Sequence, residues 1–256
     1  MNRKNAPFIR VQNLDIAYDC NVVVQDLNFD INRGDIFVIM GMSGCGKSTI
    51  MRSMIGLLPP KRGQIIIDGT DMWAANEVTR NKIISEFGVS YQSGALFSSM
   101  TVWENIALPL QLKTNMNANE INKRVREKLN LVGLDDCDDL YPSEISGGMV
   151  KRAALARAMA LNPRILFFDE PSAGLDPVRS SELDKVILDI NQKTKTTIVM
   201  VTHDLSSIMN IATNSVYIDI NTKSVGAYGA PHSILKTTKN KEIKTFLTRN
   251  CNGGQK

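Results

Sequence analysis

Along the chain, segments whose apolar residues have the spacing of a β-strand alternate with segments whose apolar residues have the spacing of a helix. The segment 27–31 alternates apolar with polar residues, which predicts a half-buried antiparallel strand. The runs 36–40, 165–168 and 197–201 are apolar throughout, and such runs are typical of strands buried on both faces of a sheet. A further strand is expected at 64–68, where an Asp-Gly pair closes it with a turn.

The middle of the chain, residues 93–160, has no clear strand pattern and carries apolar stripes at helical spacing. Asn117 and Glu120 have the spacing of a capping box, and the apolar stripe after them ends at Gly133. Another helix is expected to begin at Ser146 and to run to about the end of this segment, shortly before an Asn-Pro pair. These signals predict a group of helices.

Alternating strand and helix patterns predict an α/β fold in which helices cover a parallel or mixed sheet. The period-two strands add an antiparallel β edge, and residues 93–160 add an inserted α-helical subdomain. We expect a single domain, residues 1–256, in which 1–92 and 161–256 form the core around this insert.

Composition narrows the class of protein. The chain has 256 residues, 43% hydrophobic and 22% charged, which excludes a disordered chain. The formal net charge of +4 is too small to indicate nucleic-acid binding. The apolar runs are far shorter than the ~18 residues of a membrane span. No apolar segment follows the basic N-terminal residues as in a signal peptide, so a cytosolic protein is expected.

The cysteines are scattered and form no C-x-x-C pair, which excludes the usual zinc and redox motifs. They are Cys20, Cys45, Cys137 and Cys251. Cys45 lies in a glycine-rich loop, where we interpret it as a small side chain in a tight turn; a thiol open to alkylation is the alternative.

That glycine-rich loop follows the buried strand at 36–40. Residues 41–49 match G-x-x-x-x-G-K-[ST], with a strand before and a helix after, as a phosphate-binding loop requires. Glycines let backbone N–H groups approach phosphate oxygens, and the helix adds the positive end of its dipole. Lys47 is expected to reach the β- and γ-phosphates, and Ser48 to ligate Mg²⁺. The candidate nucleotide-binding residues are Gly41, Ser43, Gly44, Cys45, Gly46, Lys47, Ser48 and Thr49.

Two adjacent acids follow another buried strand. Asp169 and Glu170 come directly after the run 165–168, and the carboxyl ends of strands are where an open α/β sheet binds ligands. Paired buried carboxylates are costly without a cation, so we interpret them as a site for a divalent ion and phosphates. Asp169 is expected to hold Mg²⁺ through water, and Glu170 to polarise the attacking water. With the loop at 41–49, these acids predict a phosphate-loop (RecA-like) core that binds ATP.

A serine and two glycines precede the acidic strand by about twenty residues. Ser146 can cap the following helix, and Gly147 and Gly148 expose backbone N–H groups at its start, which makes a second anion-binding site. Alone, this triplet indicates only a helix cap. Before an acidic strand in a phosphate-loop protein, the anion site is the preferred interpretation.

Over nearly all of its length the chain resembles the ATP-binding cassette (ABC) family. Residues 145–149, Ile-Ser-Gly-Gly-Met, look like the family signature, usually Leu-Ser-Gly-Gly-Gln. The resemblance implies that Ser146 and Gly148 bind the γ-phosphate held by the opposite subunit of a head-to-tail homodimer, and that Gly147 is also a nucleotide-binding residue. Met149 replaces the family's glutamine, so the role of that amide is not carried over.

The same resemblance implies roles for residues elsewhere. Tyr18 resembles the aromatic residue that stacks on adenine, with an ordinary strand tyrosine as the alternative. Gln92 looks like the glutamine that meets Mg²⁺ and water, His203 like the histidine that contacts the γ-phosphate, and Asp176 like the aspartate that supports the opposite site. The implied catalytic residues are Glu170, His203, Gln92 and Lys47, and the implied metal ligands are Ser48, Gln92 and Asp169. The implied cofactors are ATP and Mg²⁺.

The segment after Gln92 resembles the place where an ABC cassette meets its membrane partner. Its apolar residues Leu96, Phe97, Met100 and Trp103 could form a docking groove for an integral membrane permease. The alternative is that they pack the core of the helical insert.

Three classes of process are compatible with such a cassette. Cassettes that act on DNA need a long coiled coil between phosphate loop and acidic strand, and the 122 positions from Lys47 to Asp169 cannot hold one. Cassettes that act on ribosomes usually carry two cassettes in one chain. We therefore expect no nucleic-acid partner, which leaves a transporter ATPase or a cell-division type of cassette without transport.

Short sequence strings favour lipid transport. Gln-Ser-Gly-Ala-Leu-Phe, Ser-Gly-Gly-Met and Pro-Ser-Ala-Gly-Leu-Asp-Pro resemble the Mla-type phospholipid-transport ATPases, which work with a permease and an MCE lipid-binding protein in Gram-negative bacteria. The resemblance implies a peripheral protein at the cytoplasmic face of the bacterial inner membrane. A methionine-type amino-acid importer ATPase is the alternative, although that group usually has an extra regulatory domain.

Overall fold

The structure, a computed structural model, describes residues 6–248, in which strands and helices alternate along the chain. The described residues divide into two units: unit 1 comprises 6–85 and 197–248, and unit 2 comprises Glu86–Thr196. The predicted α/β class, with an antiparallel edge and a helical subdomain, is confirmed. Across residues 6–248, none of the helices is both long and apolar enough to cross a membrane.

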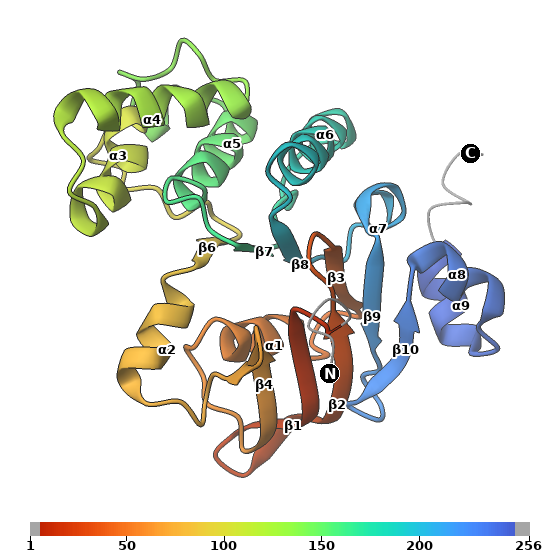
Figure 1. Cartoon of the computed structure of the whole chain (residues 1–256). Helices are drawn as coiled ribbons and strands as arrows, with labels where there is room; N and C mark the ends of the chain where they lie inside the picture. The colour runs from red at the N-terminus through yellow and green to blue at the C-terminus, as the bar shows by residue number, and fades with distance from the viewer. Residues whose placement is uncertain (1–5, 249–256) are drawn as a thin grey trace, which may run out of the picture. The chain divides into compact units, whose positions relative to one another are not determined.

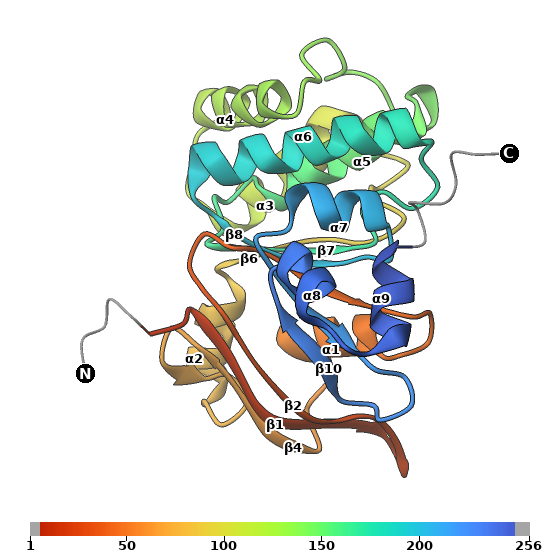
Figure 2. The ribbon, with the colours of Figure 1, turned by 90° about the vertical axis from the view of Figure 1, so that its right-hand side faces the viewer.

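An antiparallel sheet belongs to unit 1 (Figure 2). Its strands are β1 (Ile9–Tyr18), β2 (Asn21–Ile31), β4 (Arg62–Ile67) and β5 (Thr70–Asp71), in the order β2-β1-β4-β5. The strand predicted at 27–31 is the second half of β2 and pairs antiparallel with β1. The strand expected at 64–68 is β4, which begins two residues earlier. Asp68 and Gly69 make the expected turn, with φ of 49° and 83°.

A second layer of strands in unit 1 has the order β10-β9-β3-β8. The strands are β3 (Ile36–Gly41), β8 (Thr197–Val201), β9 (Asn214–Ile218) and β10 (Val225–Gly229). β3 is wholly buried and pairs in parallel with β8 on one side and β9 on the other, as its apolar run predicts. Helix α1 (Lys47–Met54) contacts β1, β3 and β8, so it lies between the two layers.

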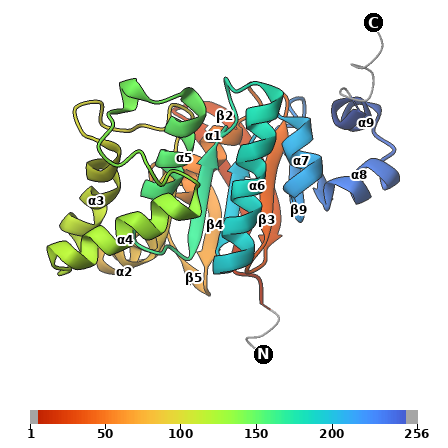
Figure 3. The same ribbon diagram turned by 90° about the horizontal axis from the view of Figure 1, so that it is seen from above.

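Four other helices of the described chain belong to unit 1. They are α2 (Glu77–Ile84), α7 (Leu205–Ile211), α8 (Pro231–Thr237) and α9 (Lys241–Thr248). α8 contacts α7, α9 and β10, and Figure 3 shows α8 beside α7 and α9. The ring of Phe246 on α9 packs edge-on against Tyr217 of β9, with centroids 5.3 Å apart. These contacts attach the last two helices to the β9–β10 side of unit 1.

Unit 2 contains the predicted helical subdomain (Figure 1). Its helices are α3 (Val102–Lys113), α4 (Ala118–Leu131), α5 (Gly147–Ala158) and α6 (Pro177–Thr194), with a 3₁₀ turn at Pro142–Glu144 before α5. α3, α4 and α5 contact one another. Strands β6 (Phe87–Ser90) and β7 (Ile165–Asp169) pair in parallel. No strand occurs in 93–160, a segment that the structure describes completely.

The helix boundaries in unit 2 follow the capping signals. Asn117 Oδ1 accepts a hydrogen bond from Glu120 N at 3.1 Å, and Glu120 Oε2 accepts one from Asn117 N at 2.7 Å, which completes the capping box. α4 ends as predicted, because Gly133 follows its C-cap in left-handed conformation with φ 66°. Ser146 caps α5, which ends at Ala158, slightly earlier than predicted.

Candidate functional site

The glycine-rich loop joins β3 to α1 in unit 1, and two of its glycines leave no room for side chains. Gly41 has φ 150°, and a Cβ there would lie 2.7 Å from both Cys45 Sγ and Ile218 O. Gly46 has φ 98°, and its Cβ would lie 2.8 Å from a methyl group of Val24. Both positions therefore need glycine, as a phosphate-loop pattern predicts.

The start of α1 has the features of an anion site. Its N-cap is Gly46, no side chain caps it, and its first turn holds no acid. The buried ammonium of Lys47 donates to the carbonyl oxygens of Gly41 and Met42, each at 3.0 Å. A Cβ added at Gly44 would have no other atom of the described chain within 4 Å, so that face of the loop is open. A positive helix end, an ammonium over the loop and an open face fit a chain of phosphates.

Cys45 is buried within this loop, and burial raises the pKa of its thiol, while the charge of Lys47 acts in the opposite direction. A thiol with a raised pKa is protonated at neutral pH and is a poor nucleophile. This supports the interpretation of Cys45 as a small side chain in a tight turn. Ser43 is exposed on the same loop, and Ser48 and Thr49 are half-buried.

Two more candidates, Tyr18 and His203, are positioned by elements next to the loop in unit 1. Tyr18 ends β1 and is 42% exposed, and its hydroxyl accepts a hydrogen bond from Arg52 Nη1 of α1 at 3.3 Å. In the parallel β3–β8 pair, Val201 lies opposite Ile39, so both strands end at one edge of the sheet. His203 follows β8 at that edge, where the phosphate loop also begins, and it is exposed.

In unit 2, Gln92 and the two acids follow neighbouring strand ends. Ser90 of β6 lies opposite Phe168 of β7 in a parallel register, so both strands end at the same edge. Asp169 is the last residue of β7, and Glu170 has left-handed backbone with φ 48°. Such backbone in a residue other than glycine costs about 1–3 kcal/mol and is frequent at functional sites. The structure therefore places Gln92, Asp169 and Glu170 at the same edge of the β6–β7 pair.

A Mg²⁺ ion held together with a nucleotide takes only some of its ligands from the protein. Within residues 6–248, no three His, Cys, Asp or Glu side chains are grouped as a metal site. Mg²⁺ is commonly bound by one or two protein oxygens together with substrate phosphates. The hydroxyl of Ser48 and the carboxylate of Asp169 are each oxygen donors of this kind, so the donor chemistry of either residue by itself fits Mg²⁺ with a nucleotide.

Ser146, at the start of α5, lies near the loop that carries Asp176. Ser146 caps the helix that Gly147 and Gly148 begin, and Asp176 caps α6 by accepting from two backbone N–H groups at 3.0 and 3.1 Å. The hydrogen bond from the Arg179 N–H is the main cause that holds the pKa of Asp176 below its usual range. A small pocket is lined by Ser146, Gly148, Arg152, Leu175, Arg179, Glu182 and Leu183. Arg179 adds a positive charge that the sequence analysis did not single out.

The sequence pattern also did not reveal the contacts that two cationic residues of α5 make. Lys151 and Arg157 donate hydrogen bonds to backbone carbonyls of the loop that begins at Gln92. In the sequence they are visible as basic residues within an alanine-rich helix segment. Their acceptors are about 60 residues away along the chain, so the pattern alone could not reveal the contact.

The docking candidates are partly accessible. Phe97 is 51% exposed, and Leu96, Met100 and Trp103 are each half-buried. The Trp103 indole N–H donates to Asn122 Oδ1 at 3.2 Å. Side chains that are fully packed in the insert would be buried, so their accessibility favours a docking surface over the alternative of an internal core.

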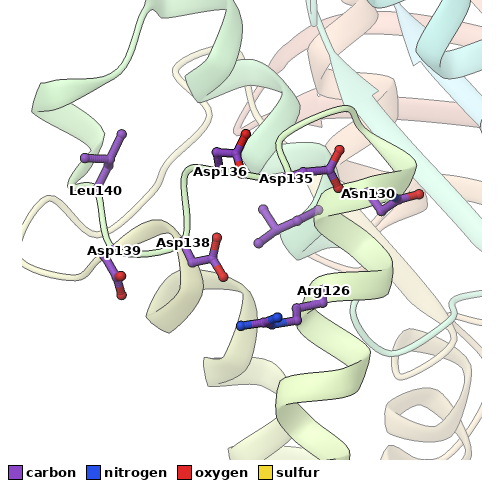
Figure 4. Close-up of a pocket in the computed structure, with 8 residues that line it drawn as sticks. Arg126, Asn130, Asp135, Asp136, Asp138, Asp139 and Leu140 are labelled. Carbon is purple, nitrogen blue, oxygen red and sulfur yellow. Dashed lines mark hydrogen bonds between the residues drawn. The ribbon is translucent and has the colours of Figure 1, made fainter.

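An acidic hollow of about 730 Å³ lies in unit 2 beside α4 (Figure 4). It is lined by Arg126, Leu129, Asn130, Asp135, Asp136, Asp138, Asp139 and Leu140. Four carboxylates repel phosphate, so we assign this surface no role in nucleotide binding. The loop that carries them supports the start of α3, because the carbonyls of Asp138 and Leu140 accept from the N–H groups of Trp103 and Val102 at 2.9 and 2.8 Å.

Comparisons with known proteins agree with this geometry. A family model described as ABC transporter matches residues 24–173. The probable ribonucleotide transport ATP-binding protein mkl of Mycobacterium leprae is 41% identical over 93% of this chain and 68% of its own length. The methionine import ATP-binding protein MetN of Desulfitobacterium hafniense is 36% identical over 94% of this chain and 71% of its own length. The intermembrane phospholipid transport system ATP-binding protein MlaF of Haemophilus influenzae is 35% identical over 97% and 93%.

A solved structure with the same fold contains the products of hydrolysis. It is the dimeric, post-hydrolysis state of the ATP-binding cassette MJ0796 bound to ADP and Pi. This chain matches it with a TM-score of 0.75 and 28% identity, over 86% of this chain and 97% of that chain.

Proposed function

Because the chain belongs to the ABC transporter family, as one of its ATP-hydrolysing cassettes, we propose that it drives phospholipid transport between bacterial membranes. The observation that carries the lipid assignment is the similarity to MlaF, which extends over 97% of this chain and 93% of that protein. The signature Ile-Ser-Gly-Gly-Met and the string from Gln92 to Phe97 support the same assignment.

Unit 1 binds the nucleotide in this proposal. Lys47 exchanges its hydrogen bonds to the carbonyls of Gly41 and Met42 for bonds to the β- and γ-phosphates, because an ionised phosphate is the stronger acceptor. Backbone N–H groups of the first turn of α1 bind the same phosphates. Tyr18, partly exposed at the end of β1, stacks on the adenine ring.

Hydrolysis is assigned to residues that follow strand ends. Phosphoryl transfer depends on positioning and on charge stabilisation, so each residue has a simple task. Glu170 orients and polarises the attacking water, Gln92 positions the same water, and His203 donates a hydrogen bond to the γ-phosphate. Ser48, Gln92 and Asp169 would hold Mg²⁺, which would supply positive charge to the phosphate oxygens.

A second copy of the chain completes the site. Ser146 and Gly148 bind the γ-phosphate held by the other copy, and Asp176 supports that copy's site. Two observations support this arrangement: Ser146, Gly148 and Arg179 line one pocket, and the related MJ0796 cassette is dimeric with ADP and Pi. ATP binding would then close the dimer, and hydrolysis would open it.

The partners follow from the lipid assignment. An integral membrane permease docks on Leu96, Phe97, Met100 and Trp103, and an MCE lipid-binding protein belongs to the same complex. The cassette then lies peripherally at the cytoplasmic face of the bacterial inner membrane. No nucleic-acid partner is proposed, since the net charge is only +4.

Reconstitution tests the cargo. The chain is coexpressed with the membrane proteins encoded beside its gene, and the complex is placed in vesicles that contain a fluorescent phospholipid. We expect ATP-dependent transfer of this lipid to acceptor vesicles, and none from a complex that carries Glu170→Gln.

Two other relatives, MetN and mkl, suggest the cargoes that would contradict the lipid assignment. MetN and mkl are 36% and 41% identical to the chain, and their names refer to methionine and to ribonucleotides. The same vesicles are therefore tested for uptake of labelled methionine and of a labelled ribonucleotide. ATP-dependent uptake of either solute, without movement of lipid, contradicts the lipid assignment.

Trp103→Ala separates a docking role from a packing role. Truncation of a tryptophan in a core typically costs ~3–5 kcal/mol of folding free energy, whereas at an interface anchor it costs ~2 kcal/mol or more of binding. Trp103 is only half-buried, so we expect a melting temperature close to wild type and weaker copurification with the permease.

A matched control is Leu112→Ala, which removes a side chain that is 70% exposed on the same helix. This variant should bind the permease normally. A large drop in the melting temperature of Trp103→Ala would place Trp103 in the core of unit 2 and remove it from the docking surface.

A further inference from the structure

The loop after Gln92 is attached to α5 by two cations. Lys151 Nζ donates to the backbone oxygen of Gln92. The guanidinium of Arg157 donates to Ala95 O at 2.7 Å through Nη1 and to Gly94 O at 3.0 Å through Nη2. Three carbonyls within four residues are thus held by one helix, through groups whose hydrogen bonds are charge-assisted.

Close packing accompanies these hydrogen bonds. Gly94 has φ 77°, and a Cβ there would lie 3.3 Å from Val150 Cγ1 and 3.4 Å from Ala154 Cβ, both on α5. Ala95 also has left-handed backbone, with φ 49°. The two residues turn the loop so that its carbonyls face α5, and the small side chains on both sides allow the close approach.

The other end of the same segment is fixed to α3. Asn105 is fully buried, and its Oδ1 accepts from Phe97 N at 2.8 Å. Its Nδ2 donates to the carbonyls of Phe97, Met100 and Thr101 at 3.0 to 3.1 Å. Residues 92–101, which we call the anchored loop, are therefore held by α5 at one end and by α3 at the other.

We propose that Lys151 and Arg157 are positioning residues that set the side chain of Gln92 for ATP hydrolysis by fixing its main chain to α5. The inference rests on the proposed function of Gln92. Neither cation needs to touch the nucleotide, because each acts through the backbone of the anchored loop. Because Ser146 caps the same helix, α5 connects the anchored loop with the signature residues 145–149.

Lys151→Met tests the proposal by steady-state ATPase kinetics. Met keeps the length of the side chain and removes its charge and its donors. We expect kcat to fall about tenfold, the loss expected for one charged hydrogen bond. KM for ATP should change less than kcat, because Lys47 and the backbone N–H groups at the start of α1 are assigned most of the binding to the phosphates. Lys151→Arg restores a cationic donor and should recover most of kcat.

A double-mutant cycle shows whether Lys151 acts through Gln92. Gln92→Ala removes the side chain and keeps the backbone carbonyl that Lys151 binds. If Lys151 only positions that side chain, Lys151→Met should not lower kcat further in the Gln92→Ala background. Additive losses would overturn the proposal, as would a fall in kcat/KM caused by KM alone.

Hydrogen exchange gives a readout that does not depend on activity. Two variants are compared: Lys151→Met, and Arg157→Lys, which keeps the charge but loses the pair of hydrogen bonds to the loop. In both variants the amides of residues 93–96 should exchange faster, while exchange in α3 stays unchanged. Unchanged exchange in both variants would overturn the proposal. The control is Lys193→Met on α6, an exposed lysine paired with Asp189 in the same unit. If wild type hydrolyses no ATP, the proposed function fails, whereas the exchange experiment still tests the anchored loop.

Discussion

Lys47→Ala is expected to abolish ATP hydrolysis and to weaken ATP binding about 10- to 100-fold, the loss expected for charged hydrogen bonds to phosphate. In the structure the Lys47 ammonium is buried and bonded to two carbonyls of its own loop, so its charge already lies where phosphates would bind. Alanine leaves the N–H groups of α1 in place and removes the lysine ammonium assigned to the β- and γ-phosphates. Titration with a fluorescent ATP analogue measures the affinity, and phosphate release measures turnover.

The control for this variant is Lys82→Ala, which removes an exposed lysine on α2 of the same unit. It should bind nucleotide and hydrolyse ATP as wild type does. Normal turnover by Lys47→Ala, measured with the membrane partner present, would show that the loop at 41–49 is not the nucleotide site.

Glu170→Gln is expected to retain ATP binding and to lower hydrolysis about 100-fold or more, because an amide cannot polarise water as a carboxylate does. Glutamine has nearly the same size and keeps hydrogen-bonding capacity, so the left-handed turn at φ 48° should persist. With hydrolysis blocked and ATP bound, the closed dimer should accumulate. Size-exclusion chromatography with light scattering, in ATP and Mg²⁺, measures the dimer directly.

Glu77→Gln serves as the matched control, since Glu77 is an exposed acid in the first turn of α2. It should hydrolyse ATP normally and show no ATP-dependent dimer beyond that of wild type. A Glu170→Gln protein that stays monomeric with ATP and Mg²⁺ would contradict the two-copy mechanism.

Elements with local signals were predicted well from the sequence. α4 has a capping box at its start and a glycine after its end, and both signals depend on residues within a few positions of each other. β3 was found because it is apolar throughout, which reflects burial between β8 and β9.

Five strands of the described chain were not predicted, namely β1, β5, β6, β9 and β10, and the reasons are clearest for β1 and β10. β1 buries Ile9 and Val11 and then Leu14 and Ile16, so its alternation changes phase at an irregularity between residues 11 and 14, where Asn13 has φ 46°. β10 contains two glycines and lies at the edge of its layer, so it carries little apolar signal. The pairing of such strands depends on distant partners that no local pattern encodes.

The functional residues also differ in whether a local sequence signal is enough to identify them. The phosphate loop is contiguous, so Gly41, Gly46 and Lys47 could be assigned from spacing alone. Tyr18 and His203 required a family resemblance, because a single aromatic or histidine has no diagnostic spacing. Neither motif spacing nor the family resemblance identified Lys151 and Arg157, because their partners are backbone carbonyls in a distant loop.

The position of β3 between β8 and β9 has a consequence for biosynthesis. β3 ends at Gly41, whereas β8 begins at Thr197, about 150 residues later. At ~5–20 residues per second, a ribosome takes roughly 8–30 s to make that stretch. During this time an entirely apolar strand has left the ribosome without either of its neighbours, while Glu86–Thr196 is contiguous and can fold as it emerges. Until β8 and β9 are made, residues 36–41 therefore lack the strands that bury them in the folded protein, and unpaired apolar strands of this kind are prone to aggregate.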